Sequence, residues 1–325
     1  MIIDLARLDA QAFDTLYTSR IAPLFEAAES ERKGAVAQFK KRMTIGVPVA
    51  LAIGAAIWIF TAEWLPGAVV SAFAALAAAG IAQMPLNRVA QNLKAKTLRA
   101  LAESIGATYQ PEGRPPALIE RQRELDLLPK SDRAHFEDWF HGERHGCAFD
   151  LCEGHLEDER RDKDGDRSWV TVFRGQIIRI SFPKPFQAVT VVRRDSGVFN
   201  GMVGWASRMQ RVGFADPDFE RKFEVYGTDQ VEAHYLVHPV FAERLLQLED
   251  AYDGKRLRCA FQNGDLLIAV ETPNKYEMGD MFKTLIDPSR ARVIVEDIAA
   301  VLRVMDAVLT AERAPLMGKG PLDRA

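Results

Sequence analysis

The clearest pattern along the chain is a long apolar block near its start. Residues 45–84 read IGVPVALAIGAAIWIFTAEWLPGAVVSAFAALAAAGIAQM and contain one charge, Glu63. The stretches on either side of this charge, about residues 43–62 and 65–86, are each long enough as helices to cross a hydrocarbon core of about 30 Å. Buried helices of soluble proteins seldom run so far without a charge. The pattern therefore predicts a transmembrane helical hairpin over residues 43–87, rather than a buried hairpin of a soluble protein.

The residues that flank this block indicate its orientation. Pro66 suits the first turn of a second helix after a turn at residues 61–66, and the connecting loop has no basic residue. Basic side chains lie outside both spans: Lys40, Lys41, Arg42, Arg88, Lys94, Lys96 and Arg99. The positive-inside rule then places both termini in the cytoplasm. We expect an integral protein of the cytoplasmic (inner) membrane, with membrane lipids as partners.

Small residues recur every four positions in both predicted spans, as they do where helix backbones pack closely in lipid. They are Gly46, Ala50 and Gly54 in the first span, and Gly67, Ser71, Ala75 and Ala79 in the second. Chance explains such a stripe equally well in an alanine-rich block. No ionisable residue lies deep inside either span, and carriers usually need one there. The block therefore reads as an anchor.

The segments on either side of the block have helical periodicity. Residues 1–42 predict a cytoplasmic helical arm that is bent or interrupted near Pro23. No heptad pattern is sustained, so we expect an amphipathic helix packed on its own domain rather than a coiled coil. Residues 88–130 predict a helical stalk and linker, broken by PEGRPP at residues 111–116 and followed by a short helix and a loop.

The remainder of the chain, residues 131–312, mixes strand and helix patterns, and residues 313–325 form a flexible tail. Asn263-Gly264 between two apolar runs predicts a β-hairpin, and His238-Pro239 predicts a junction between two short helices. Strands are expected at residues 147–158, 168–182, 188–194 and 256–270, and helices at residues 228–252 and 289–309. This order indicates an α+β domain with a largely antiparallel sheet, covered by the final helix. Residues assigned to the apolar side of that helix are Val293, Ile294, Ile298, Val301, Leu302, Met305 and Leu309.

Composition narrows the function classes. The chain has 325 residues and a formal net charge of −3, which does not favour nucleic-acid binding. Its three cysteines are too few for a disulfide framework and fit a reducing compartment. The first forty residues are too polar for a signal peptide.

One cluster of metal-ligand residue types lies in the expected α+β domain. His141, His145, Cys147, Cys152 and His155 fall within fifteen residues, and imidazoles and thiolates bind zinc. Their spacing matches no zinc motif, because a Cys-x4-Cys pair alone is a weak signal. Alternation along a strand would also place the two cysteines on opposite faces. A buried Cys147 with surface histidines is the simpler interpretation.

Other candidate motifs are incomplete. His234 and His238, with Glu232 nearby, have the i, i+4 spacing of a metal-binding pair on one helix. Pro239, however, indicates that His238 lies at a helix boundary. DKDGD, residues 162–166, lacks the flanking acids of a calcium loop and reads as a turn. The glycine-rich residues 197–213 lack the phosphate-binding pattern. Asp216, Asp218, Asp229 and Glu232 are expected near helix N-termini. The sequence therefore assigns no catalytic, cofactor-binding or metal-binding residue.

Several blocks also carry a family resemblance. EDWFHGERHGCAFDLCEGHLED, VFRGQIIRISFPKPF, DPDFERKFEVYGTDQVEAHYLVHP and LLIAV follow one another over most of residues 135–285. Together they resemble the domain-of-unknown-function 3137 family of bacterial membrane proteins. The sequence departs from the family pattern at residues 213–215 and at His238. The resemblance implies a helical N-terminal part, two adjacent spans and a cytoplasmic domain. It implies no activity and no site residues.

Three functions remain open after these observations. The first is a membrane-anchored cytoplasmic binding or scaffold module with a protein partner, a lipid headgroup, a small ligand or a second copy of itself. The second is a membrane-tethered enzyme with residues 135–155 or 228–250 as its site. The third, a two-span oligomeric pore, is disfavoured by the missing charge inside the spans.

Overall fold

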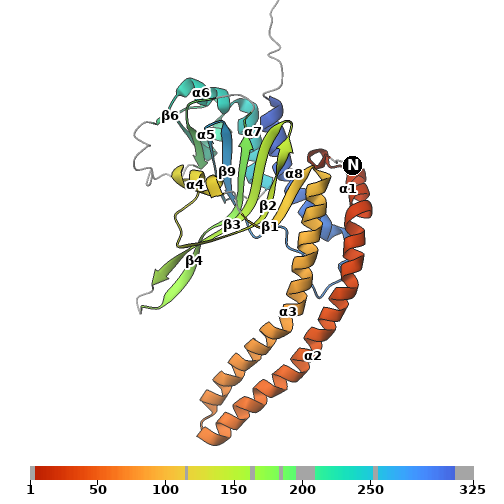
Figure 1. Ribbon diagram of the computed structural model, residues 1–325. Coiled ribbons are helices and arrows are strands. Elements are labelled where there is room, and N and C mark those ends of the chain that lie inside the picture. The colour runs from red at the N-terminus through yellow and green to blue at the C-terminus, as the bar shows by residue number, and fades with distance from the viewer. Residues whose placement is uncertain are drawn as a thin grey trace, which may run out of the picture. The chain divides into compact units, whose positions relative to one another are not determined.

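The protein has an α+β fold: two long apolar helices near the N-terminus precede an antiparallel sheet with helices (Figure 1). The structure, a computed structural model, describes residues 4–113, 116–161, 165–182, 186–194, 209–251 and 255–311. The chain divides into two compact units. The helical unit contains residues 10–100 and 276–293, and the sheet unit contains residues 1–9, 101–275 and 294–325.

The helical unit is built on a long antiparallel hairpin. α1 (Ala10–Leu16) continues through a π-helical turn (Tyr17–Ile21) into α2 (Ala22–Thr61), and α3 (Trp64–Ser104) begins three residues later. Pro23 is the second residue of α2, and because it has no N–H it cannot continue the main-chain hydrogen bonding of the preceding helical turn. The predicted irregularity near this proline is therefore a π-helical turn just before it. Ala62, with a φ of 55°, ends α2 in the left-handed conformation.

The sheet unit contains one nine-stranded sheet in the order β1-β2-β3-β4-β9-β8-β5-β7-β6. Each pair of neighbouring strands is antiparallel. The longest members are β2 (Arg133–Arg144), β3 (Cys147–Arg161) and β4 (Arg167–Ser181). The predicted hairpin is confirmed as β8 (Lys255–Gln262) and β9 (Asp265–Glu271). Asn263 and Gly264 have φ values of 50° and 77°, as the tight turn requires.

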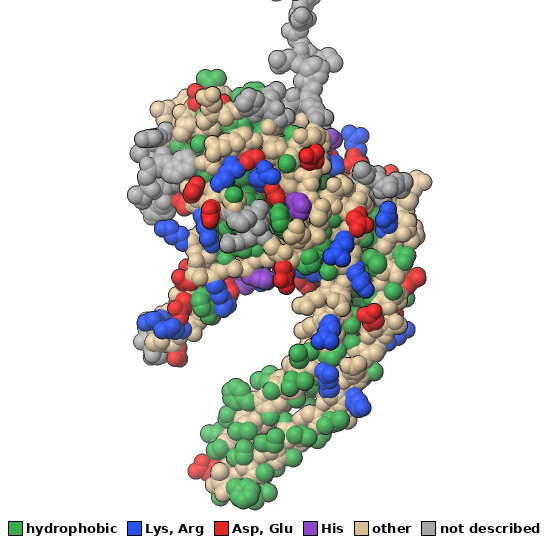
Figure 2. All heavy atoms as spheres, viewed as in Figure 1, with side chains coloured by type: hydrophobic (Ala, Val, Ile, Leu, Met, Phe, Trp, Pro, Cys, Tyr) green, Lys and Arg blue, Asp and Glu red, His purple; other side chains and the backbone are tan. Residues whose placement is uncertain are grey.

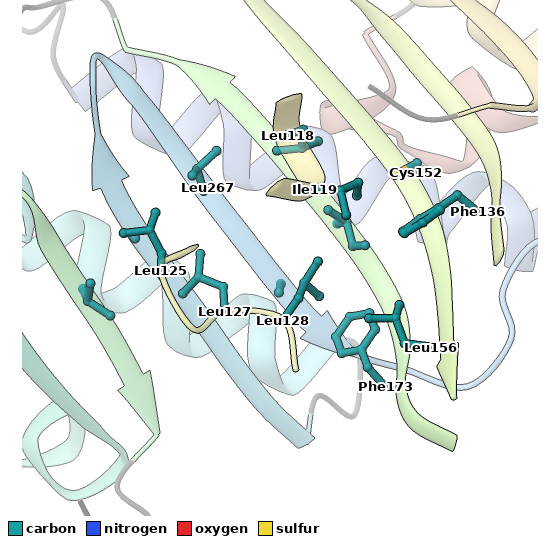
Figure 3. Packing of buried hydrophobic residues seen from close by; sticks show 14 residues of the cluster. Leu118, Ile119, Leu125, Leu127, Leu128, Phe136, Cys152, Leu156, Phe173 and Leu267 are labelled. Carbon is teal, nitrogen blue, oxygen red and sulfur yellow. The ribbon is translucent and has the colours of Figure 1, made fainter. Parts of the chain in front are cut away.

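A short helix, α4 (Pro116–Glu124), covers one face of the sheet. Leu118 and Ile119 of the helix, with Leu125, Leu127 and Leu128 just after it, form one apolar cluster with strand residues of that face (Figure 3). Gln122, which is fully buried, donates hydrogen bonds to the main-chain oxygens of Ile178 and Ile268. The helix is therefore fixed to the sheet by apolar packing and by one amide. The strand members of this α4 cluster are Phe136, Cys152, Leu156, Phe173, Ile177, Val191, Ala260, Leu267 and Ala269.

The final helix, α8 (Pro288–Ala311), supplies a second set of core residues. Ile294, Val295, Ile298, Val301, Leu302, Met305 and Leu309 are all buried. In Figure 1 this helix lies behind the sheet. The sequence prediction was wrong at one position, since Val293 is 61% exposed and Val295 is buried in its place. Three hydrophobic residues in a row, Val293 to Val295, left the helical phase ambiguous.

The remaining predicted strands and helices are present. β5 (Thr190–Arg194), α6 (Gln230–Leu236) and α7 (Pro239–Ala251) fall where the sequence placed them. The edge strand β1 (Ala107–Glu112), with β2, β6 (Gln210–Val212), α5 (Pro217–Lys222) and β7 (Phe223–Gly227), had no sequence prediction. β1 lies within the segment expected to be stalk and linker, and it pairs with β2. Three parts of the predicted segments lie outside the described residues: 162–164 of the turn expected at residues 162–166, 197–208 of the glycine-rich segment 197–213, and the tail 313–325.

Candidate functional site

The most unusual surface in the protein is on the α2–α3 hairpin. Both helices are long and apolar enough to cross a membrane, and only 11% of each apolar window is buried. Figure 2 shows apolar side chains covering the end of the hairpin where α2 and α3 are connected. Lys and Arg side chains lie farther along the helices, away from this connection. Phe60 is 91% exposed and Ile59 79%. Fifteen large apolar residues are exposed: Ile45, Val49, Leu51, Ile53, Trp58, Ile59, Phe60, Trp64, Leu65, Val69, Val70, Phe73, Leu76, Ile81 and Met84.

This surface is unusual for a helical hairpin in water and is compatible with a non-aqueous environment. Monomeric soluble proteins rarely expose a contiguous apolar patch larger than about 300–600 Å². A core helix of a soluble domain would bury most of its apolar side chains, whereas these helices leave them outside. The hairpin is thus suited by length, composition and exposure to insertion in lipid.

The two helices approach each other closely through small residues. A Cβ added at Gly54 would lie 1.8 Å from Ser71 Oγ and 2.5 Å from the main-chain oxygen of Gly67. A Cβ at Gly67 would lie 2.5 Å from the main-chain oxygen of Gly54. Ser71 Oγ donates a 3.1 Å hydrogen bond to the oxygen of Ala50. The small-residue stripe therefore marks a true packing seam at these four positions, and Gly46 adds a contact with Ala78.

At the opposite end of the apolar part of the hairpin, an arginine side chain bonds to a main-chain oxygen that a proline leaves without its helical partner. Pro85 lies inside α3 and has no N–H, so it cannot bond to the oxygen of Ile81 one turn earlier. Arg42 Nη1 of α2 donates a 2.8 Å hydrogen bond to that oxygen. An open carbonyl is costly where water is scarce. Arg42 is therefore both a flanking charge and a link between the two helices.

A distant segment of the chain is fixed to the base of the hairpin. Within the helical unit, Arg32 and Glu29 of α2 form an ion pair 2.7 Å long, and both are buried. Arg32 Nη1 donates to the main-chain oxygen of Met281 at 3.1 Å, and Leu285 N donates to Glu29 Oε2 at 2.9 Å. We call residues 276–293 the docked segment. Its interior side chains Met281 and Leu285 are buried.

The chemistry of this ion pair explains its protonation. The hydrogen bonds from Arg32, with the one from the Leu285 amide, lower the pKa of Glu29 to about 2, against the opposing effect of burial. The same pairing raises the pKa of Arg32. Both groups are therefore charged at neutral pH. Lys94 of α3 adds a further link, since its Nζ lies 3.3 Å from Glu277 Oε1.

The structure separates the five metal-ligand candidates of the sheet unit. His145 Nε2 lies 2.8 Å from Asp306, His155 Nε2 lies 2.9 Å from Thr171 Oγ1, and His141 Nε2 lies 3.4 Å from Gln110. Cys147 and Cys152 are buried free thiols, and burial raises the pKa of Cys152 to about 12. Across the described part of the chain, no group of three or more His, Cys, Asp or Glu could hold a metal ion.

The acidic and histidine candidates of residues 216–238 shape helix ends. Asp216 accepts from the main-chain N–H of Asp218, and Asp229 from that of Glu232, as N-cap residues do. Glu232 in turn accepts from the main-chain nitrogen of Ala188 at 2.5 Å. His238 lies just before α7 and accepts from Phe241 N, whereas His234 belongs to α6. The two histidines are therefore not neighbours on one helix.

A chain of charged and polar groups crosses four strands, and the sequence analysis did not predict it. Arg179 of β4 bonds to Asp150 of β3 at 2.6 Å and to Asp265 of β9 at 3.3 Å. Arg121 of α4 lies 2.5 Å from Asp265, and Trp139 Nε1 of β2 donates to Asp150. Each carboxylate in this chain is matched by a guanidinium. The arrangement ties α4 to the sheet and is suited to structure rather than proton transfer.

Comparisons with known proteins support the predicted family resemblance. Residues 171–309 match the profile of the family described as "Protein of unknown function (DUF3137)". The block at residues 137–158, which also suggested this family, lies outside the matched range. No curated protein matches the chain. A solved structure, the mycobacterial trehalose monomycolate transport factor A, TtfA, is 13% identical over 65% of this chain and 96% of its own. Its TM-score of 0.35 supports no conclusion about the present chain.

Proposed function

We propose that this chain, with its DUF3137-type domain, is a membrane-anchored binding or scaffold protein. The α2–α3 hairpin spans the cytoplasmic membrane, and both termini and the sheet unit lie in the cytoplasm. The observation that carries this proposal is the exposed apolar surface from Ile45 to Met84. The basic residues on both flanks of the hairpin and their absence from its tip support the orientation.

A labelling experiment tests both the anchoring and its direction. Glu63→Cys places a thiol at the tip of the hairpin, and Ser30→Cys places one on an exposed turn of α2. The three native cysteines are buried, so the wild type serves as the background. In intact spheroplasts an impermeant maleimide should label only position 63, and position 30 should react after lysis. Labelling of position 30 alone before lysis would reverse the orientation. Labelling of both positions, or of neither position, before lysis would contradict the two spans.

The assignment as a binding module is supported by how the sheet unit uses its polar groups. Asp216, Asp229 and Glu232 are engaged with main-chain N–H groups, and His145 with Asp306. The same region presents apolar residues outward: Val231 is 81% exposed, Val240 46% and Tyr235 43%. Val231 and Tyr235 lie one helical turn apart on α6, and contiguous exposed apolar side chains are one mark of a surface that binds another protein.

Site-specific photo-crosslinking tests this part of the proposal. A photoreactive amino acid at Val231 of the full-length chain in cells should give a discrete crosslinked product, identified by mass spectrometry. The same amino acid at Thr108, exposed on the edge strand β1, is the control. Products at Val231 and none at Thr108 would support a partner-binding surface. No product at Val231, Tyr235 or Val240 would contradict it.

A further inference from the structure

One aromatic side chain of the docked segment is out of place for a water-facing loop. Phe282 packs edge-on against Phe39 of α2, with ring centroids 5.0 Å apart, yet it is 47% exposed. Its main-chain oxygen accepts a hydrogen bond from Arg32 at 3.3 Å. Met281 and Leu285, on either side of it, are buried. The ring is therefore held outward by a fixed backbone and not by a loose loop.

The position of Phe39 gives the depth of this ring. Phe39 precedes Met43, the start of the uncharged stretch, by four residues, or about 6 Å along an α-helix. The headgroup layer on each side of a bilayer is about 5–8 Å thick. If the hairpin spans the membrane as proposed above, Phe282 lies at the level of the headgroups. Ile286 lies farther from the span. It follows Leu285, whose N–H donates to Glu29, and Glu29 is ten residues, or about 15 Å along the helix, farther from the span than Phe39.

Cationic side chains surround this level. Lys40, Lys41 and Arg88 are exposed, and Lys283 is exposed next to Phe282. Among the described residues, no carboxylate forms an ion pair with Lys40, Lys41 or Arg88. Juxtamembrane cations attract anionic lipids by about 1 kcal/mol per residue, while Phe, Trp and Tyr favour the interfacial layer. The exposed cations and the aromatic ring of Phe282 therefore lie next to the apolar surface of the hairpin, and their chemistry matches that of the lipid headgroup layer.

We propose that Phe282 and the exposed Lys40, Lys41 and Arg88 form a collar that binds the anionic lipid surface of the cytoplasmic leaflet. This inference rests on the proposed membrane anchoring and adds to it. The docked segment, which begins more than 170 residues after the end of the hairpin in sequence, inserts an aromatic ring among the headgroups. The α2–α3 hairpin is then not the only part of the chain that contacts lipid.

Nitroxide depth measurements on the full-length chain test the position of the ring. Single cysteines at Phe282, Ile286 and Phe73 are spin-labelled and reconstituted in phosphatidylcholine–phosphatidylglycerol vesicles, and accessibility to oxygen and to a water-soluble nickel chelate is compared. Phe73 is 70% exposed within the second apolar stretch and should read as hydrocarbon. Position 282 should show a loss of nickel accessibility relative to position 286. Lys283→Cys is a second reporter if labelling at position 282 perturbs folding.

The outcomes separate the two proposals. A hydrocarbon signal at position 73, with equal nickel accessibility at positions 282, 283 and 286, would overturn the collar and leave the anchor intact. Full nickel accessibility at position 73 would overturn the anchor, and the collar with it.

Native mass spectrometry tests the lipid preference. The wild type should retain phosphatidylglycerol over phosphatidylcholine, and Lys40→Gln/Lys41→Gln should reduce this preference about tenfold or more, since each cation contributes about 1 kcal/mol. Lys96→Gln/Arg99→Gln removes two exposed cations that lie farther from the span and should leave the preference unchanged. Equal retention by both variants would contradict the role of Lys40 and Lys41.

Discussion

Pro85 removes one main-chain hydrogen bond from α3, and Arg42 of α2 supplies a replacement. The bond from Arg42 Nη1 to the oxygen of Ile81 is 2.8 Å long. Arg42 is one of three consecutive basic residues, and topology alone would accept a positive charge at any of them. The structure distinguishes it, because it alone among Lys40, Lys41 and Arg42 donates to the carbonyl that a proline has left open.

This relation gives a test at single residues. We expect Arg42→Gln to destabilise the hairpin by about 1 kcal/mol, the worth of one hydrogen bond. In the Pro85→Ala background the new N–H can bond to Ile81, so the same substitution should cost much less. The free energies would come from unfolding in mixed micelles, followed by the loss of the helical circular dichroism signal. Lys41→Gln is the charge-matched control. Equal costs in both backgrounds would contradict the assigned role.

Glu29 gives a second test, through pH. Its pKa is lowered to about 2 by Arg32 and the Leu285 amide, from an ordinary value of 4.5. A carboxylate with a depressed folded-state pKa stabilises the fold fully above its unfolded pKa and loses this effect as pH falls toward the folded value. Glu29→Gln should therefore be less stable than wild type by about 2 kcal/mol at pH 7, and the difference should shrink between about pH 5 and pH 2.

The readout for Glu29 should be specific to the docked segment. Hydrogen exchange at neutral pH should show a less protected Leu285 amide in Glu29→Gln, while amides in β8 and β9 stay protected. Thermal unfolding in detergent from pH 7 downward gives the difference between the two proteins. A difference that stays constant down to pH 2 would rule out the ion pair as its source.

Helix packing in the hairpin depends on the absence of side-chain atoms at two glycines. Gly54 and Gly67 face each other so closely that a Cβ at either would lie 2.5 Å from a main-chain oxygen of the other helix. Backbone atoms cannot move aside as a flexible side chain can. Gly67→Ala should therefore force the helices apart at a cost of about 1–3 kcal/mol.

A matched control for Gly67 exists in the same helix. Nothing lies within 4 Å of a Cβ built at Gly80, so Gly80→Ala should cost nothing. Both variants would be compared by their unfolding in mixed micelles. If Gly67→Ala proved as stable as Gly80→Ala, the close contact between α2 and α3 would be wrong.

Helices and strands that have a local sequence signal could be predicted. Strands that form only by pairing with a neighbouring strand could not. Asn263-Gly264 required a tight turn, and Pro239 required a helix start. β1 and β6 are edge strands of at most six residues, and their sequences show little alternation. Each exists because a neighbouring strand offers hydrogen bonds, which local sequence does not reveal.

Of the candidate site, the sequence predicted only the apolar hairpin, because composition is enough to identify it. An apolar block of this length with a single charge predicts two helices that could cross a membrane by length and composition. The ion pair of Arg32 and Glu29 could be expected from i, i+3 spacing, but its bonds to residues 281–285 join positions about 250 residues apart. The chain through Asp150, Arg179 and Asp265 needed strand register. A charge inside an apolar strand signals that a partner is required, and it does not name the partner.

For the molecule as a whole, everything proposed here depends on α2 and α3 lying in lipid. The direct measurement is fractionation of cells that express the untagged full-length chain, with an alkaline carbonate wash of the membranes. The chain should remain in the washed membrane pellet and be released only by detergent. Recovery in the detergent-free supernatant as a monodisperse monomer would contradict the membrane anchor, and with it the orientation and the lipid collar.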